Sequence, residues 1–466
     1  MAGEWQLAKI GDIAERVAMG PFGSSIKVET FVPSGVPVIS GQHLRGTKVD
    51  DKVGFNFVSE EHAQRLRNAN VRRGDVIFTH AGNIGQVAFV PESAQFERYV
   101  VSQRQFYMRC NRDKVLPEFV VAYFKTPKGQ HSLLANTSQV GVPSIAQPVT
   151  YLRTIEIPLP PLPEQRAIAH ILGTLDDKIE LNRRMSETLE AMARALFKAR
   201  FVDFEPVRAK HALSKVEGMA GRWQRGQSLP GLPAYLYDLF PDRLVDSELG
   251  EIPEGWEVTK LGEMINAVKG TSYRSDELAE SDTALITLKS FARGGGYRAE
   301  GLKSFSGAYK PAQVVVPGEV VIACTDVAQA AEVIGRPAVA RATHEFRTLV
   351  ASLDTLIVRP REPEMTRSFL YFLTGTDEFV AHTYAHTTGT TVLHLSKDAV
   401  PSFRFACPPP GLVKSFDSLA SSVLHRLQTI QQESDALANL RDTLLPKLIS
   451  GELRVPDAER WLEATQ

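Results

Sequence analysis

Polar and basic side chains follow short predicted strands at two places in this chain, and their types suit contacts with nucleic-acid bases. Arg, Lys, Asn and Gln are the side chains that most often hydrogen-bond base edges in the major groove of DNA. The candidates for base contact are Gln42, His43, Arg45, Lys48 and Arg104 in the first half of the chain, and Lys289, Arg293, Tyr297, Arg298 and Arg347 in the second. The alternative for each of them, a solvated surface side chain, stays open at this point.

Small, hydroxyl-rich loops in both halves have the composition of phosphate-binding turns. Glycine exposes backbone N–H groups, and Ser, Thr and Lys side chains donate hydrogen bonds to phosphate oxygens. The candidates for phosphate contact are Gly20, Ser24, Ser25, Lys27, Tyr273, Arg274, Thr388 and Thr390. A similar loop spans residues 137–141. Ordinary turns are the alternative for all of these loops.

The sequence contains no arrangement of residues that indicates catalysis or metal binding. Residues 221–228 resemble a phosphate-binding loop, but Gln227 stands where the lysine belongs. Three histidines invite a metal interpretation, yet no carboxylate or cysteine lies at ligand spacing from His382, His386 or His394. We therefore expect no catalytic residue, no metal and no cofactor bound by this chain.

Composition indicates an ordinary soluble protein of the cytoplasm. The 466 residues carry a net charge of −1, with 43% hydrophobic and 23% charged side chains. Three widely separated cysteines argue for a reducing compartment. Without an apolar run of about 18 residues or a signal-peptide pattern, we expect no membrane association. Proteins that hold DNA unaided usually carry a basic excess, so a DNA-binding role predicts partners that supply positive charge.

The candidate residues lie within a sequence repeat whose period is about 248 residues. Residues 5–13 are similar to residues 256–264, and the proline-rich run at 160–163 matches the run at 408–411. A period this far above solenoid lengths indicates one structural unit used twice. We predict two copies of a module that consists of a globular domain followed by a long helix.

Each globular domain is predicted to mix helices and strands. β-Branched and aromatic runs bounded by Gly and Pro predict strands at 36–39, 75–79, 86–90, 314–316, 320–323 and 354–358. Apolar residues at helical spacing predict short helices at 117–126 and 366–374. The predicted fold class is therefore α+β, with two globular domains separated by two long antiparallel helices that pair as a coiled coil.

The two long helical patterns carry a heptad seam, with apolar residues at alternating steps of four and three. The seam residues are Ile168, Leu172, Leu175, Ile179, Leu189 and Leu196 in the first helix, and Phe416, Val423, Leu427, Ile430, Leu437 and Leu444 in the second. A single helix of this kind is not stable alone, so we expect the two copies to pair. Asn182, Ser186 and Ser434 are polar seam positions that could set the register, and Pro446 should end or kink the second helix.

The predicted segments follow from these patterns. They are a first globular domain at 1–158, a helix at 159–200, a connector at 201–250, a second globular domain at 251–407, a second helix at 408–450 and a tail at 451–466. Antiparallel pairing would relate the two modules by an internal pseudo-two-fold axis, so one chain could present the same surface twice.

Four ordered motifs resemble the specificity (S) subunit of type I restriction-modification systems. They are residues 159–165 with the helix that follows, 202–210, 246–256 and 444–453. The resemblance covers nearly the whole chain. It implies that each globular domain is a target recognition domain that reads one half of a bipartite site in double-stranded DNA, and that the helices act as a spacer.

The resemblance also implies partners. Two methyltransferase subunits would dock on the helices, and restriction subunits would add ATP-dependent translocation and cleavage. S-adenosylmethionine, ATP and Mg²⁺ would then belong to the partner subunits. We predict a non-catalytic subunit that sets DNA specificity in the defence against foreign DNA. The alternatives are a fused restriction–methylation enzyme, against which the missing Asn-Pro-Pro-Tyr or -Phe motif argues, and a coiled-coil adaptor of another DNA-modification or defence complex.

Overall fold

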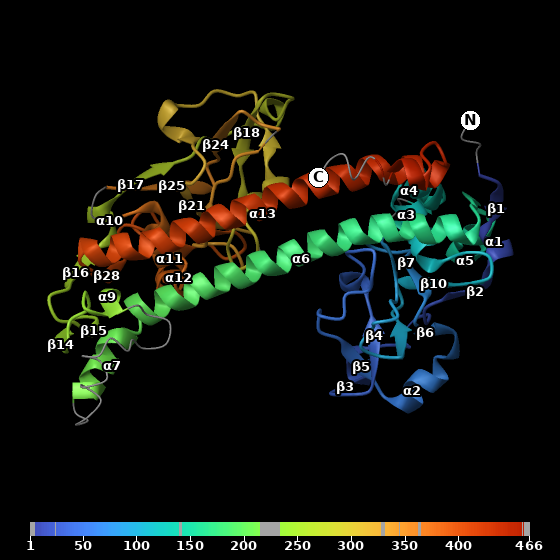
Figure 1. Ribbon diagram of the computed structural model, residues 1–466, viewed down its shortest axis with the longest axis horizontal. Helices are drawn as coiled ribbons and strands as arrows, with labels where there is room; N and C mark the ends of the chain where they lie inside the picture. The colour runs from blue at the N-terminus through green and yellow to red at the C-terminus, as the bar shows by residue number, and fades with distance from the viewer. Residues whose placement is uncertain are drawn as a thin grey trace. The chain divides into compact units, whose positions relative to one another are not determined.

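The computed structural model describes residues 5–23, 25–138, 142–214, 234–327, 331–343, 345–361, 365–458 and 460 (Figure 1). Its contacts divide the chain into two compact units. The first unit consists of Met1–Asn182 and Glu433–Gln466, and the second of Arg183–Gln432. Each unit therefore combines one globular domain with part of each long helix, α6 (Leu162–Phe201) and α13 (Pro410–Ser450). Within the described ranges, no helix is long and apolar enough to cross a membrane.

The first globular domain is built around two sheets. Its strands are β1 (Leu7–Lys9), β2 (Ala14–Met19), β3 (Phe31–Val32), β4 (Val36–Ile39), β5 (Asn56–Val58), β6 (Asn70–Arg72), β7 (Asp75–Thr79), β8 (Val87–Phe89), β9 (Arg98–Val101), β10 (Gln105–Cys110), β11 (Thr137–Ser138), β12 (Ser144–Ile145) and β13 (Glu156–Pro158). Its helices are α1 (Ile10–Ile13), α2 (Glu60–Arg65), α3 (Pro117–Lys125), α4 (Pro127–Leu134) and α5 (Pro148–Thr154), with short 3-10 turns η1 (Val28–Thr30), η2 (Gly41–His43) and η3 (Arg67–Ala69). Among the described residues, one sheet has the order β2-β10-β7-β8 and the other β3-β5-β4-β9-β6.

The second globular domain repeats this plan. Its strands, with the hairpin that precedes them, are β14 (Leu244–Ser247), β15 (Gly250–Pro253), β16 (Glu257–Lys260), β17 (Ile265–Lys269), β18 (Thr283–Ile286), β19 (Lys303–Ser304), β20 (Val314–Val315), β21 (Val320–Ala323), β22 (Thr325–Asp326), β23 (Pro337–Val339), β24 (Thr348–Ala351), β25 (Thr355–Pro360), β26 (Thr387–Thr388), β27 (Leu393–Leu395) and β28 (Arg404–Cys407). The helices of the connector and domain are α7 (Glu205–Ser214), α9 (Ala234–Tyr237), α10 (Leu261–Met264), α11 (Arg367–Thr374) and α12 (Asp377–Ala385), with turns η4 (Ser275–Glu277), η5 (Leu288–Ser290), η6 (Ala299–Gly301) and η7 (Pro311–Gln313). The sheet orders are β17-β25-β21-β23 and β19-β18-β24-β20.

The two domains share a hydrogen-bonded frame as well as an element order. β4 pairs with β9 in parallel, as β18 does with β24, and the edge pair β1–β13 matches the pair β16–β28. The backbone N–H of Ile10 donates to Ile155 O at 2.9 Å, and that of Leu261 donates to Phe403 O at 2.8 Å. The mixed α/β fold with a duplicated domain is therefore confirmed.

A buried ion pair is also duplicated. Arg109 Nη2 lies 2.7 Å from Asp75 Oδ2 in the first domain, and Arg359 Nε lies 2.6 Å from Glu319 Oε1 in the second. Both carboxylates are buried, and each also accepts a backbone N–H from the preceding turn. A buried charge is tolerated when it is paired and hydrogen-bonded. The pair therefore locks the third strand of each sheet onto its neighbour.

In the first unit, α6 runs antiparallel to α13. Asp176 of α6 bonds to Arg441 of α13 at 2.8 Å, and the amide nitrogen of Asn182 donates to Ser434 Oγ at 3.3 Å, so rising numbers on one helix meet falling numbers on the other. The buried side chains between them join the core of the first domain; they are Ile168, Ile171, Leu172, Leu175, Leu444, Leu445, Leu448 and Ile449. Asn182 is fully buried, so the predicted polar seam position bonds across the helix pair.

In the second unit, aromatic rings join the two helices to the domain. Phe416 of α13 lies 5.3 Å from Phe197 and 5.5 Å from Phe201 of α6, measured between ring centroids. The same ring lies 5.4 Å from Phe372 of α11. Edge-to-face contacts of this kind add to the free energy of apolar burial. Phe416 is thus shared by both helices and the second domain.

The buried stripe departs from the predicted seam toward the end of α6. Leu189 and Leu196 are only half-buried, whereas Ala193 and Phe197 are buried. A straight helix of 3.6 residues per turn drifts against a strict heptad, so the inward face moves by about one residue over this length. On the partner helix, Leu427 and Ile430 are buried. Ile179, Val423 and Leu437 are half-buried.

Pro446 was predicted to end or kink the second helix, and it does not end it. The helix α13 continues through Pro446 to Ser450. Pro446 is exposed, while Leu444 and Leu448 on either side are buried. Burial of these neighbours holds the last turn in place although the proline contributes no N–H donor.

Replacing Phe416 by Ala should destabilise the second unit by about 3–5 kcal/mol, because a shared, fully buried ring is removed and a cavity is left. Urea unfolding of the full chain measures this change. Leu419→Ala, on the same helix but 38% exposed, is the matched control and should cost far less. Equal losses of unfolding free energy in the two variants would contradict the role of Phe416 in joining the helices to the domain.

Candidate nucleic-acid interface

The first domain has a polar cleft at the ends of three strands. The turns after β4 and β7 and the turn between β9 and β10 enclose a volume of about 570 Å³. The polar side chains on its walls include Gln42, His43, Arg45, Asn83, Gln103 and Arg104. Four of these, all except Asn83 and Gln103, were predicted from the sequence as base-contact candidates. The cleft thus brings together residues that are up to 62 positions apart in the chain.

His43 supports the cleft and does not project into solvent. Its ring is 1% exposed and stacks on Phe55 at 4.3 Å between centroids. Nδ1 lies 3.0 Å from the N–H of Ser40, and Nε2 lies 3.4 Å from Gly54 O. Burial lowers the pKa of His43, so its neutral form is favoured. The prediction of His43 as a base reader is corrected: it fixes the turn that carries Gln42.

Three side chains at the mouth of the cleft are exposed and free. Arg45, Asn83 and Arg104 make no side-chain hydrogen bond or ion pair with any residue that the structure describes. Arg104 lies over Gly82, where a Cβ would come 3.4 Å from its Nη1. The amide of Gln103, by contrast, donates to Ile26 O at 2.8 Å. A guanidinium and an amide with unused donors are suited to base edges.

Lys48 does not take part in the cleft. Its ammonium lies 2.5 Å from Asp177 of α6, and Lys52 lies 3.5 Å from Glu180 on the same helix. Thr47 Oγ1 donates to Asp176 at 3.2 Å. These contacts tie the domain to its own helix, because the turn that holds Lys48 faces α6 and not the cleft mouth. The prediction of Lys48 as a base reader is therefore corrected.

The predicted phosphate loop of the first domain is only partly available. The N–H of Gly20 donates to Gln105 O at 2.9 Å, and a Cβ at Gly20 would lie 2.2 Å from Ser102 O. Gly20 is therefore a packing requirement and not a phosphate donor. The hydroxyl of Ser25 donates to Phe22 O at 2.7 Å, and Lys27 is exposed. Ser24 lies outside the described residues, as do positions 139–141 of the second hydroxyl-rich loop.

The second domain holds its predicted candidates in several places. Lys289, Arg274 and Arg347 are exposed, and Tyr273 is half-buried with the Lys303 ammonium 6.0 Å from its ring centroid. Thr388 and Thr390 are exposed on the turn between β26 and β27. Two arginines pair with carboxylates of their own domain: Arg293 with Glu332 at 3.0 Å and Arg298 with Glu300 at 3.8 Å. These residues therefore do not lie together in one group.

Comparison with known proteins gives matches to one family. Residues 2–191 match the model of the type I restriction modification DNA specificity domain. The chain is 23% identical, over 97% of its length and all of the relative's, to the type I restriction enzyme HindI specificity subunit of Haemophilus influenzae. It is also 23% identical, over 97% of its length and 94% of the relative's, to the MjaIX specificity subunit of Methanocaldococcus jannaschii. The S subunit from M. genitalium, a crystal structure, shares its fold with a TM-score of 0.50, 15% identity and 96% coverage of both chains.

The chain is thus similar, over nearly its whole length, to the specificity subunits of type I restriction-modification systems.

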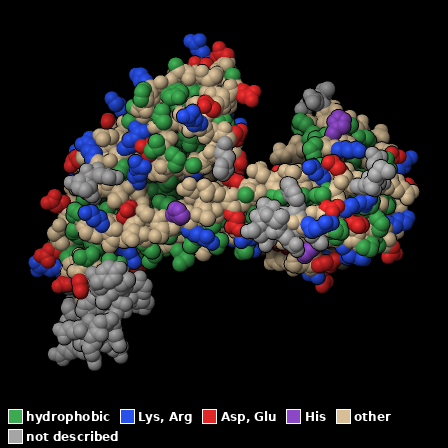
Figure 2. Space-filling model, turned by 45° about the horizontal axis from the view of Figure 1, so that its top comes forward, with side chains coloured by type: hydrophobic (Ala, Val, Ile, Leu, Met, Phe, Trp, Pro, Cys, Tyr) green, Lys and Arg blue, Asp and Glu red, His purple; other side chains and the backbone are tan. Residues whose placement is uncertain are grey.

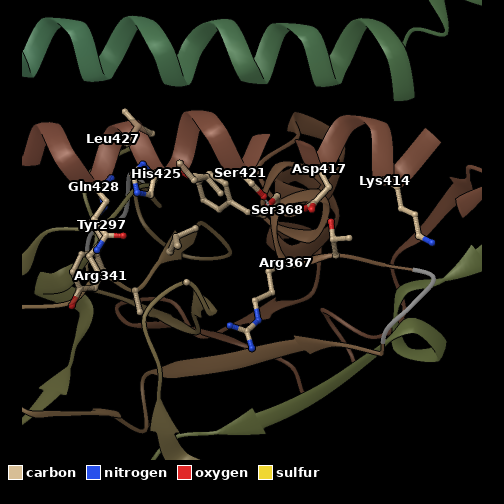
Figure 3. Close-up of a pocket in the computed structure, with 16 residues that line it drawn as sticks. Tyr297, Arg341, Arg367, Ser368, Lys414, Asp417, Ser421, His425, Leu427 and Gln428 are labelled. Atoms are coloured by element: carbon tan, nitrogen blue, oxygen red, sulfur yellow. Dashed lines mark hydrogen bonds between the residues drawn. The ribbon is translucent and has the colours of Figure 1, made fainter. Parts of the chain in front are cut away.

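A second groove lies between the second domain and α13, with a volume of about 530 Å³. Figure 3 shows Tyr297 and Arg341 near Gln428 at one end, and Lys414 with Asp417 at the other. The hydroxyl of Tyr297 is buried without a hydrogen-bond partner among the residues that the structure describes, and burial raises its pKa. The prediction of Tyr297 as a base reader is corrected, because its hydroxyl lies in this groove.

The same place in the first unit is closed by ion pairs. There Asp176, Asp177 and Glu180 of α6 hold side chains of the 47–52 turn, as described above. At the matching positions, 248 residues later, α13 carries Leu424, His425 and Gln428, which offer no carboxylate. The basic side chains that line the groove make no hydrogen bond or ion pair with the described residues; they are Arg341, Arg367 and Lys414. The second unit thus leaves open a cationic groove that the first unit fills.

Charge is dispersed on one face of the chain. On the face that Figure 2 shows, Lys and Arg side chains are mixed with Asp and Glu side chains and do not gather in one patch. Within the described residues, no group of three or more His, Cys, Asp and Glu side chains is arranged to hold a metal ion. The rings of His382 and His386 lie 4.3 Å apart between centroids, with their planes tilted by 34°.

Acid should weaken the first domain through His43. Its pKa in the folded chain lies below the ordinary value of about 6.5, so the unfolded chain binds the proton more readily. The stabilisation is full above that value and falls as pH drops through and below it, by at most about 1.4 kcal/mol per pH unit for one histidine. His43→Asn, which keeps an acceptor near Nδ1, should flatten this dependence in urea unfolding between pH 7.5 and 5.5. His170→Asn, on exposed α6 surface, is the control, and an unchanged slope in His43→Asn would contradict the assignment.

Proposed function

We propose that this chain recognises a bipartite site in double-stranded DNA, with one half read by each globular domain. One observation carries the proposal: the two domains share a hydrogen-bonded frame but present different side chains on its matching turns. A shared frame explains how both domains can approach DNA in the same way, and different side chains explain why the two halves of the site differ in sequence.

In the first domain, we assign sequence readout to the mouth of the polar cleft. Arg45 and Arg104 suit the two acceptors of guanine, and Asn83 suits the donor and acceptor of adenine. Exposed Lys27 and the turn around it are suited to the phosphate backbone. Buried His43 and the amide of Gln86, which donates to Gly41 O at 3.1 Å, would hold the readers in place.

We propose that this chain does not catalyse a reaction itself. S-adenosylmethionine, ATP and Mg²⁺ would bind to partner subunits, which would methylate, translocate along or cleave the DNA. The support is the similarity to specificity subunits and a sequence without the Asn-Pro-Pro-Tyr or -Phe motif. The net charge of −1 agrees with a complex in which partners provide much of the attraction for phosphate.

We further propose that two methyltransferase subunits dock on the chain, one on each unit, with restriction subunits joining through them. Each unit offers a pair of antiparallel helices beside the same domain frame, which supports two related docking surfaces. The cationic groove along α13 in the second unit is unlike its counterpart. Its unpaired Arg341 and Lys414 suit an acidic segment of the methyltransferase subunit.

Methylation mapping tests the readout. In cells that express this chain with its methyltransferase subunit, the methylated adenines should lie in one asymmetric bipartite sequence. Arg104→Ala should relax base preference in one half only, with a loss of discrimination of about 1–3 kcal/mol, since one bidentate contact is removed. Arg67→Ala, an exposed arginine elsewhere in the same domain, is the control and should leave the motif intact. Relaxation of both halves, or of neither, would contradict the assignment.

Charge reversal tests the groove. The double variant Arg341→Glu with Lys414→Glu should lower the ratio of methyltransferase to specificity subunits in the purified complex, from two toward one. Lys397→Glu makes the same change on exposed surface of the same domain, outside the groove, and should keep the ratio at two. If the double variant still binds two methyltransferase subunits, the groove is not part of the docking surface.

A further inference from the structure

We infer that the two domains read their half-sites with different chemistry at four matched positions, which we call the reading rims. The first rim consists of Gln42, Asn83, Gln103 and Arg104, and the second of Lys289, Val327, Leu353 and Asp354. The first rim is suited to the hydrogen-bonding edges of purines. In the second rim, Lys289 also suits a purine acceptor, whereas Val327, Leu353 and Asp354 are suited to pyrimidines, through the amino group of cytosine and the methyl group of thymine. This inference rests on the proposed function of the two domains.

The turn between the two central strands gives the register of two positions. In the first domain, the N–H of Ser102 donates to Ile39 O at 2.9 Å, and the N–H of Gln105 donates to Ser102 O at 3.1 Å. In the second, Ser352 N donates to Ile286 O at 3.1 Å, and Thr355 N donates to Ser352 O at 2.8 Å. The two residues inside each turn are therefore equivalent. Gln103 and Arg104 correspond to Leu353 and Asp354.

The segment after the neighbouring strand gives the third position. The N–H of His80 donates to Arg104 O at 2.9 Å, and the N–H of Cys324 donates to Asp354 O at 2.7 Å. One residue later, the backbone of each domain pairs with a segment further along the sequence: Ala81 pairs with Ser144 in the first domain, and Thr325 pairs with His394 in the second. The third residue after the matched N–H is Asn83 in one domain and Val327 in the other.

A 3-10 turn gives the fourth position. The N–H of His43 donates to Ser40 O at 3.0 Å in η2, and that of Ser290 donates to Thr287 O at 2.9 Å in η5. The residue before each of these donors is exposed: Gln42 in the first domain, whose amide donates to Gly54 O at 3.2 Å, and Lys289 in the second. The frame therefore holds three of the four pairs by the same backbone bonds, and Asn83 and Val327 each follow two residues after the last matched position, Ala81 and Thr325.

Two residues of the second rim are exposed aliphatic side chains, so this rim differs from the first by more than the loss of polar groups. Val327 is 73% exposed and Leu353 is 44% exposed, both large values for aliphatic side chains on a turn. Two exposed aliphatic side chains, at matched positions where the first domain has polar side chains, are suited to a ligand with apolar groups at that place. In the DNA major groove, the apolar group is the C5-methyl of thymine.

The charge at one matched position changes sign. Arg104 and Asp354 have the same backbone partners, and neither side chain has a hydrogen bond or ion pair among the described residues. Arginine donates two hydrogen bonds to guanine O6 and N7, whereas aspartate accepts one from the N4 amino group of cytosine. Phosphates repel a carboxylate, so Asp354 is tolerable at a DNA surface only where it meets a donor. The same position would thus demand an acceptor in one half-site and a donor in the other.

Base analogues separate the two chemistries. The intact complex of this chain with its methyltransferase subunits is bound to duplex oligonucleotides that carry the mapped site. Replacing guanine by 7-deazaguanine in the first half-site removes the N7 acceptor and should weaken binding roughly tenfold or more at one position. Replacing thymine by uracil in the second half-site removes only the methyl group and should weaken binding about three- to fivefold.

Variants tie each effect to its rim. Arg104→Ala should abolish the sensitivity to 7-deazaguanine, and Val327→Ser with Leu353→Ser should abolish the sensitivity to uracil. Val316→Ser removes an aliphatic side chain that is 44% exposed elsewhere in the second domain, and it should leave both sensitivities unchanged. Asp354→Asn keeps the size of the side chain but adds a donor, so it should relax the preference for cytosine at one position.

The outcomes separate this inference from the proposed function. Sequence-specific binding in which the analogue effects are absent, or persist in the rim variants, would overturn the rims while leaving the bipartite recognition in place. A complex whose sequence preference does not depend on this chain at all would overturn both. Analogue effects that vanish only with the matching rim variants would establish the assignment.

Discussion

The structure depends on burying the apolar stripes of two helices that are not stable alone. α6 has 40 residues and α13 has 41, and each carries a polar surface outside one apolar face. The surface that covers this face comes partly from the globular domain and partly from the other long helix, which is more than 200 residues away in the chain. In the first unit, Asp176 contacts Arg441 and Asn182 contacts Ser434 across the two helices. In the second unit, a cluster of phenylalanines around Phe416 joins the helices. Each compact unit therefore needs both halves of the chain.

This constraint links stability to recognition. Because the helices close each unit from outside the domain, the domain itself is free to vary on the turns that face away from the helix pair. The parts that must be kept are backbone bonds, the buried Asp75–Arg109 and Glu319–Arg359 pairs, and glycines where no Cβ fits. The parts that differ between the copies are exposed side chains on matched turns. One frame can in this way carry two specificities.

Much of the architecture could be predicted from residue patterns. The duplication, the mixed domains and the start of the seam at Ile168 follow from spacing, because heptads and strand patterns are local signals. The drift of the stripe to Ala193 and Phe197 could not be predicted from a strict heptad, since it depends on the accumulated rotation of a long helix. The continuation of α13 past Pro446 depends on the burial of neighbouring leucines, which a proline rule does not include.

The cleft was predictable only in part. Gln42, Arg45 and Arg104 could be selected by residue type after a strand, but His43 has the same signal and turns inward, because it fills the space beside Phe55. Asn83 was missed because it lies in a glycine-containing turn whose residue types do not distinguish it from an ordinary turn. Asp354 was missed because a base reader was expected to be basic or an amide, and only matched backbone bonds reveal that it stands where the first domain has an arginine.

The central claim is that each domain reads its own half of the site on a common frame. A chain in which residues 5–158 also replace residues 256–407 carries the first domain twice and keeps both helices. Mapping methylated adenines in cells that express it with the methyltransferase subunit tests the claim most directly. The account predicts a symmetric site made of two inverted copies of the first half-site. An unchanged asymmetric site, or one that retains the second half-site, would contradict it.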